Sequence, residues 1–153
     1  MKSNSQVILA LDSSDIPSTM EMIEKTKYYI GVYKLGLEFY LAQGKEGVRE
    51  IQKCFSGIEI FLDLKLHDIS NTVAGACRSI ADLSPRFLTV HASGGSKMIA
   101  AASSSLPKVE ITAVTILTSL DQEALLAMGF KEKIEDLTPV SYTHLTLPTI
   151  CSV

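Results

Sequence analysis

The sequence predicts an α/β fold, a TIM or (β/α)8 barrel of which about the first five βα units are present. Five apolar runs alternate with helical patterns at intervals of roughly 25 residues, which is typical of βα units in a parallel sheet. Each run has polar residues at or just beyond its C-terminal end, the rim where barrels build their active sites. An open, doubly wound sheet also gathers ligands at this edge, but the turn after the first run lacks the glycines of a dinucleotide site.

The five strands are expected where apolar and β-branched residues cluster between turn signals. They cover residues 7–11, 32–36, 58–66, 87–91 and 109–117. The second carries one charge, Lys34, and the fourth ends in His91. Apolar residues on both faces of such runs indicate strands that are buried in a parallel sheet.

The helices are expected where apolar residues recur at intervals of three and four. They cover about 17–29, 42–55, 71–83, a segment after Gly95, and 122–128. Pro17 follows Ser13-Ser14-Asp15, a combination that is typical of a helix start. Gly31 ends the first helix and Gly129 the last, because glycine favours the C-terminal position of a helix.

The bulk composition describes an ordinary globular protein. The chain has 153 residues, 46% hydrophobic and 20% charged, with a net charge of -3 and no basic stretch that would suit nucleic acid. It shows neither a signal peptide nor an apolar segment long enough for a membrane, so a cytoplasmic location is expected. Cys54, Cys77 and Cys151 lack metal-ligand spacing, which favours ordinary thiols in a reduced compartment.

A charged cluster interrupts the third apolar run. Asp63, Lys65 and Asp68 stand within residues 61–69, among leucine, isoleucine and phenylalanine. Residues two apart in a strand point the same way, so Asp63 and Lys65 project from one face while the intervening leucines pack on the other. A lysine between carboxylates stays protonated and can donate a proton to a neighbouring carbon or oxygen. The alternative is a surface ion pair on an edge strand.

The pattern changes near the C-terminal end. Residues 138–153 have no helical period, two prolines, several threonines and no charge. We therefore expect a partial barrel domain over residues 1–137 and a non-native tail from about Thr138. A natural short protein with a disordered tail is the alternative.

Several motifs between Ile8 and about Leu137 together resemble orotidine 5'-phosphate decarboxylases of the bacterial type. These motifs are Leu11-Asp12, Tyr33-Lys34-Leu35-Gly36, Phe61-Leu62-Asp63-Leu64-Lys65-Leu66-His67-Asp68-Ile69 with Asn71-Thr72, Val90-His91-Ala92-Ser93-Gly94-Gly95, and Leu117-Thr118-Ser119. The Asp-x-Lys-x-x-Asp core is shared with hexulose-phosphate synthases and ketogulonate-phosphate decarboxylases. Those relatives carry a glutamate at the second strand, where this chain and the orotidylate enzymes have a lysine, Lys34.

The resemblance implies conversion of orotidine 5'-phosphate to uridine 5'-phosphate and carbon dioxide in pyrimidine synthesis, without a metal or organic cofactor. Lys65 would protonate C6 of the pyrimidine, and Asp63 would orient Lys65 beside the substrate carboxylate. Lys34 would complete the charge array and reach the ribose hydroxyls. Asp12 would bind the ribose as well.

The resemblance also implies a homodimer. Asp68, Ile69 and Thr72 would reach into the neighbouring subunit's site, and Thr118 and Ser119 would contact the pyrimidine edge. For Thr118, a simple turn or helix-entry residue is an equal alternative.

The remaining polar candidates are interpreted as structural. His67 and His91 lack a second ligand cluster and are expected to be hydrogen-bonded residues rather than metal ligands. Gly94-Gly95 is expected to permit close packing, although a phosphate at a helix start is the alternative.

The family's phosphate clamp, a glutamine and a Gly-Arg pair in late barrel loops, is absent from this sequence. We therefore expect the fragment to be inactive. Two other functions stay open: a sugar-phosphate decarboxylase or synthase on the same scaffold, and a non-catalytic half-barrel. Five strands of an eight-stranded barrel would leave unpaired edges, so aggregation or molten behaviour is expected.

Overall fold

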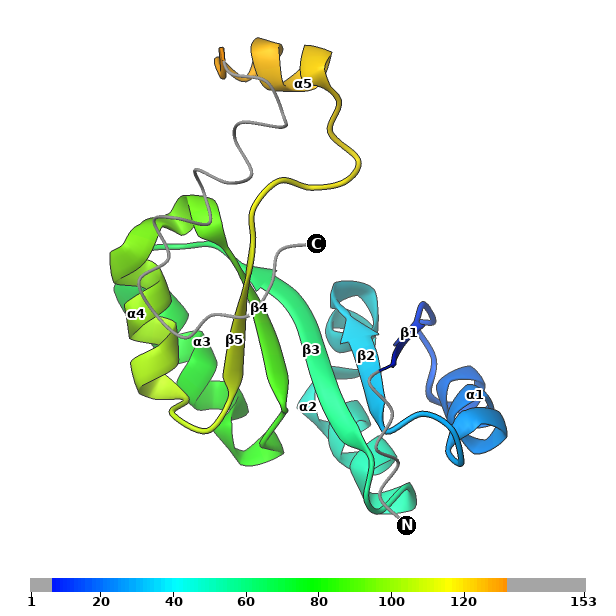
Figure 1. The fold of residues 1–153 in the computed structure, drawn as a ribbon. Coiled ribbons are helices and arrows are strands. Elements are labelled where there is room, and N and C mark those ends of the chain that lie inside the picture. Colours follow the sequence, from blue (N-terminus) through cyan, green and yellow to red (C-terminus); the bar gives the residue numbers. More distant parts are fainter. Residues whose placement is uncertain (1–6, 132–153) are drawn as a thin grey trace.

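The computed structural model describes residues 7–131, in which five strands alternate with helices (Figure 1). The strands are β1 (Ile8–Leu11), β2 (Val32–Gly36), β3 (Glu59–Leu66), β4 (Phe87–His91) and β5 (Glu110–Val114). The α-helices are α1 (Ile16–Thr26), α2 (Leu37–Cys54), α3 (Ser70–Ile80), α4 (Gly95–Ser105) and α5 (Gln122–Ala127). Short 3-10 helices, η1 (Ala81–Leu83) and η2 (Ala92–Gly94), follow α3 and β4.

All five strands are parallel and lie in the order β1-β2-β3-β4-β5. A doubly wound sheet reverses its strand order at a switch point, whereas a barrel adds each strand beside the previous one. The order therefore confirms the prediction of a barrel segment. Because β3 occupies the centre of the sheet, the alternative of an ion pair on an edge strand is wrong.

The two faces of the sheet have different roles. Figure 1 shows helices α1 to α4 along the outside of the curved sheet, from α4 at one end to α1 at the other, while α5 lies apart beyond the end of β5. The side chains beneath them form the core and include Tyr33, Leu35, Ile60, Leu62, Leu88 and Val90, each at most 2% exposed. Alternate residues of the same strands face the barrel interior, and the charged side chains stand among them.

Helix α2 differs from the expectation of a helix over 42–55. It begins at Leu37, directly after β2, and contains a break at Gly44, whose φ is 62° and ψ is -164°. Glycine adopts this conformation without a Cβ penalty, so the chain bends there and continues as a helix. The bend brings Gln43 over Gly47, where an added Cβ would overlap with Gln43 Cβ.

Strand β5 is shorter than the expected 109–117. It ends at Val114, whose register partner is His91, the last residue of β4. Beyond this pair β4 offers no further backbone partner, so residues 115–117 leave the sheet despite their β propensity. The expected helix over 71–83 is likewise divided, into α3 and η1.

An ion-pair cluster joins three neighbouring strands at the amino end of the sheet. Arg86, just before β4, contacts Glu59 of β3 through Nη1 at 2.6 Å and Glu110 of β5 through Nε at 3.4 Å. Its guanidinium also lies 4.8 Å from the ring centroid of Phe87. The ion pairs of Arg86 therefore connect β3, β4 and β5 at the amino end of the sheet, while the carboxyl end carries the candidate site.

The expected domain boundary near Leu137, the tail from Thr138 and Cys151 all lie outside the described residues. Within residues 7–131, Cys54 is exposed and Cys77 is buried, and burial raises the pKa of the Cys77 thiol to about 11. None of the helices in this part of the chain combines the length and apolar character needed to cross a membrane.

Candidate active site

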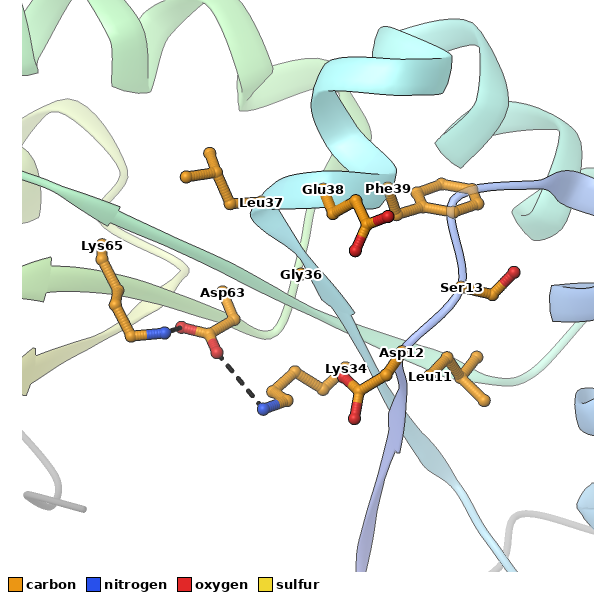
Figure 2. Close-up of a pocket in the computed structure, with 10 residues that line it drawn as sticks. All are labelled: Leu11, Asp12, Ser13, Lys34, Gly36, Leu37, Glu38, Phe39, Asp63 and Lys65. Carbon is orange, nitrogen blue, oxygen red and sulfur yellow. Dashed lines mark hydrogen bonds and ion pairs between the residues drawn. The ribbon is translucent and has the colours of Figure 1, made fainter. Parts of the chain in front are cut away.

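Charged side chains from two strands, β2 and β3, and from the loop after β1 converge on one cavity at the carboxyl edge of the sheet. The cavity measures about 310 Å³, and its lining includes Asp12, Lys34, Asp63 and Lys65 (Figure 2). A second cavity, of about 410 Å³, lies on the inner face and shares Lys34, Asp63 and Lys65 with the first. The sequence placed these four residues in one site, and the structure brings them together.

Asp63 stands between two ammonium groups. Its Oδ1 lies 2.8 Å from Lys65 Nζ, and its Oδ2 lies 3.3 Å from Lys34 Nζ. The Asp63 side chain is 11% exposed, whereas Lys34 and Lys65 are 29% and 36% exposed. The result is an alternating array, Lys34–Asp63–Lys65, in which the carboxylate is buried and both cations still reach the cavity.

The environment of Asp63 favours its ionised form. Burial by itself raises the pKa of this carboxyl. Hydrogen bonds from Lys65 and Thr89, together with the charges of Lys65 and Lys34, outweigh burial and hold the pKa below its usual value. Asp63 is therefore held as the anion of the array, between the Lys34 and Lys65 side chains.

The alternation of β3 is interrupted within the array. Leu62 pairs with Leu88 and Leu66 pairs with Val90, so three residues of β3 stand opposite Thr89 alone. Lys65 adopts a left-handed backbone, with φ at 49°. The sequence expectation that Asp63 and Lys65 share a face is met, but in a bulge rather than in a regular strand.

Thr89 is the residue of this site that the sequence analysis missed. It is 3% exposed, and its hydroxyl contacts both Asp63 and the backbone of Lys65. The sequence did contain a polar residue in the middle of an apolar strand. Thr89 is two residues before His91, so the two side chains are expected on the same face. Its partners became evident only from the pairing of β4 with β3.

The other predicted site residues have different positions. Thr118 lines the second cavity from a turn after β5, and Ser119 is exposed in that turn and lines neither cavity. Asp68, Ile69 and Thr72 are exposed beyond the end of β3 and also line neither cavity. Of these five, only Thr118 is brought to the charge array within a single chain.

Two histidines stand at the rim beside Lys65. The rings of His67 and His91 are 5.2 Å apart, and burial, followed by the charges of His67 and Lys65, lowers the pKa of His91. In the described part of the chain, no group of three or more His, Cys, Asp and Glu side chains is arranged to hold a metal ion. A Cβ on Gly94 would overlap with Met98 and lie 3.3 Å from His67, which supports the packing role expected for this glycine.

The parallel sheet, its outer helices and its charged carboxyl edge define a protein of the β/α-barrel class. The chain belongs to the family described as Orotidine 5'-phosphate decarboxylase / HUMPS family, whose family model matches residues 5–140. The resemblance inferred from the sequence motifs is thereby confirmed.

Individual relatives agree with this assignment. The orotidine 5'-phosphate decarboxylase of Thermobifida fusca is 44% identical over 130 residues, which are 85% of this chain and 55% of that protein. The protein of the same name from Novosphingobium aromaticivorans is 46% identical over 124 residues, covering 80% and 54%. The crystal structure of orotidine 5'-phosphate decarboxylase from Lactobacillus acidophilus has a TM-score of 0.75 and 31% identity, covering 88% of this chain and 64% of that chain. The chain thus spans about half the length of the curated relatives.

Proposed function

We propose that this chain carries the decarboxylation centre of an orotidine 5'-phosphate decarboxylase, which forms uridine 5'-phosphate and carbon dioxide in pyrimidine synthesis in the cytoplasm. The observation that carries the proposal is the Lys34–Asp63–Lys65 array, with both ammonium groups within 3.3 Å of one buried carboxylate. The names of the relatives at 44% and 46% identity support the same reaction. The barrel part of the chain is proposed to end near Leu137.

In the proposed reaction Lys65 is the acid. The bond between C6 of the pyrimidine and its carboxylate breaks, carbon dioxide leaves, and the electron pair stays on C6. A proton then moves from Lys65 Nζ to C6, and the neutral amine regains a proton from water. The ammonium also stabilises the negative charge that develops at C6, because it acts in a partly dehydrated cavity.

The neighbouring residues are proposed to orient the acid and the substrate. Asp63 holds Lys65 Nζ at 2.8 Å and thereby restricts the flexible side chain to one direction. Lys34 and Asp12 line the same cavity and are proposed to bind the ribose. Thr118 and Ser119 are proposed to contact the pyrimidine edge.

The exposed residues after β3 support a proposed homodimer. Ile69 is 71% exposed, so its large apolar side chain is available for contact with a second subunit. Asp68 Oδ1 accepts a hydrogen bond from the Ile69 backbone at 2.6 Å, which fixes the direction of this segment. We propose that Asp68, Ile69 and Thr72 complete the site of a second subunit.

The proposal is tested with a completed barrel. The region that this chain shares with the Thermobifida fusca relative is joined to the remaining C-terminal part of that protein, and turnover of orotidine 5'-phosphate is followed. Lys65→Ala is expected to reduce kcat by about 10³-fold or more, because the acid is removed. Lys108→Ala, a matched change of an exposed lysine before β5, is expected to leave kcat unchanged.

Two results would contradict the proposal. One is a chimera that unfolds cooperatively yet leaves orotidine 5'-phosphate untouched, and the other is a Lys65→Ala chimera with full turnover. The alternative of a sugar-phosphate decarboxylase or synthase predicts dependence on magnesium. Orotidine 5'-phosphate turnover that persists in a chelator therefore favours the decarboxylase.

A further inference from the structure

The bulge in β3 creates a backbone problem that Thr89 solves. Between the pairs Leu62–Leu88 and Leu66–Val90, β3 advances four residues while β4 advances two. The amide of Lys65 therefore has no regular ladder position opposite a β4 carbonyl. A buried amide without a partner would destabilise the fold, and the Lys65 N–H instead donates to Thr89 Oγ1 at 2.8 Å.

The same hydroxyl also holds the catalytic carboxylate. Thr89 Oγ1 donates to Asp63 Oδ1 at 2.9 Å, the oxygen that also accepts from Lys65 Nζ at 2.8 Å. A hydroxyl has one proton to donate, so acceptance from Lys65 N–H directs that proton towards Asp63. The buried Thr89 side chain thus holds both the carboxylate of Asp63 and the backbone of Lys65.

The conformation of Lys65 needs such support. A lysine at φ 49° occupies a region that residues with a Cβ rarely adopt, and it persists only where surrounding contacts determine it. The hydrogen bond from the Lys65 amide to Thr89 is such a contact. Without it, β3 would be free to relax towards a regular strand, and the Lys65 side chain would leave Asp63.

We propose that Thr89 is a positioning residue of the site: its hydroxyl holds the bulge at Lys65 and orients Asp63, so that the Lys65 ammonium points at the reacting carbon. The second part of this statement rests on the proposed function. The first concerns the architecture of the array alone and is testable without turnover.

Three substitutions separate the hydroxyl from the shape of the side chain. Thr89→Val keeps the branched shape and removes both hydrogen bonds, whereas Thr89→Ser keeps the hydroxyl and removes a methyl group. Thr112→Val is the matched control, because Thr112 is the register partner of Thr89 on β5 and is also buried, at 8% exposure. No hydrogen bond joins Thr112 to the array in the part of the chain that the structure describes.

The first readout is the titration of Asp63 in the completed barrel, followed by NMR of its side-chain carboxyl carbon. The groups that face this carboxylate are Lys65 on β3, Lys34 on β2 and Thr89 on β4, with Asp12 beyond Lys34 (Figure 2). Thr89→Val removes the hydrogen bond from Thr89 to Asp63 and loosens the one from Lys65 Nζ. The titration midpoint of Asp63 is therefore expected to move to higher pH. Thr89→Ser is expected to restore the native midpoint, and Thr112→Val to leave it unchanged.

The second readout is kinetic and uses the completed barrel. Thr89→Val is expected to lower kcat about tenfold, with a smaller change in KM, because the orientation of the acid is lost while the ribose contacts stay. Thr89→Ser is expected to recover most of kcat. A merely structural role would not produce this rescue together with a kcat effect larger than the KM effect.

The outcomes distinguish the two proposals. An Asp63 midpoint that is the same in Thr89→Val and in the native chain overturns the positioning role. A shifted midpoint in a chain whose completed barrel does not turn over orotidine 5'-phosphate supports the positioning of the array and overturns the proposed reaction instead.

Discussion

Replacing Gly47 by alanine tests the bend in α2. Alanine in place of a glycine inside a helix ordinarily stabilises a protein by about 1 kcal/mol, because glycine has the greater conformational freedom when unfolded. At Gly47 the opposite sign is expected. The bend at Gly44 places Gln43 so close that a new Cβ would overlap with Gln43 Cβ, and Phe39 Cζ would lie 3.6 Å from it.

The magnitude follows from which atom must move. Non-bonded carbon atoms prefer separations of about 3.5–4.0 Å, and a Cβ cannot be displaced by rotating its own side chain. The backbone of α2 must therefore shift, which costs about 1–3 kcal/mol for overpacking in a dense core. After subtraction of the gain in helix propensity of about 1 kcal/mol, Gly47→Ala is expected to lower the free energy of unfolding by up to about 2 kcal/mol.

The control is Gly75→Ala in α3. Among residues 7–131, a Cβ there would meet only Arg78 Nη2, at 3.8 Å, so the ordinary gain of about 0.5–1 kcal/mol is expected. Urea unfolding of the completed barrel, followed by far-UV circular dichroism, compares the two variants, whose midpoints should differ by roughly 1 M for an m-value of about 2 kcal/mol/M. Equal or higher stability of Gly47→Ala relative to the native chain would refute the close approach that underlies the argument.

Two further predictions follow from pKa values. Hydrogen bonds from Lys45 and Arg49 hold the pKa of Asp82 at about 2, below its ordinary 3.8, so this ion-pair cluster contributes to stability above about pH 4 and is lost as the pH falls to about 2. Asp82→Asn should flatten the dependence of the urea midpoint on pH in that window, and an unchanged slope would contradict the assignment. Because burial raises the pKa of Cys77 to about 11, iodoacetamide at mildly alkaline pH should label Cys54 before Cys77. Peptide mapping by mass spectrometry measures this order, which denaturant should abolish.

The strands and the composition of the site were accessible from the sequence because both depend on local patterns. The run Val32–Gly36 was expected with the bounds that the structure gives, since Gly31 and Gly36 enclose a short apolar segment. Asp63 and Lys65 were recognisable because charges inside an apolar strand are costly unless they meet partners. Lys34, which is paired with Phe61 two residues before Asp63, provided one such partner from the neighbouring strand.

The parts that were missed depend on contacts between distant residues. The role of Thr89 arises from a register shift between β3 and β4, and neither strand shows that shift in its own sequence. The end of β5 at Val114 is set by the length of β4 rather than by the residues that follow it. Gly44 was included in an expected helix, where its left-handed backbone could not be anticipated from helical spacing alone.

The sequential order of the strands has a consequence for folding. Each strand pairs with the strand that precedes it in the chain, so each pairing joins residues roughly two dozen positions apart, as Ile8 with Val32 and Phe87 with Glu110. Such moderate sequence separation limits the loop entropy lost at each step, and the sheet can grow in the direction of ribosomal synthesis. The contact of Asp63 with Lys34 needs only the pairing of β3 with β2, and its contact with Thr89 needs only the pairing of β4 with β3. The charge array and its support by Thr89 therefore draw on β2, β3 and β4 and need no residue of β5.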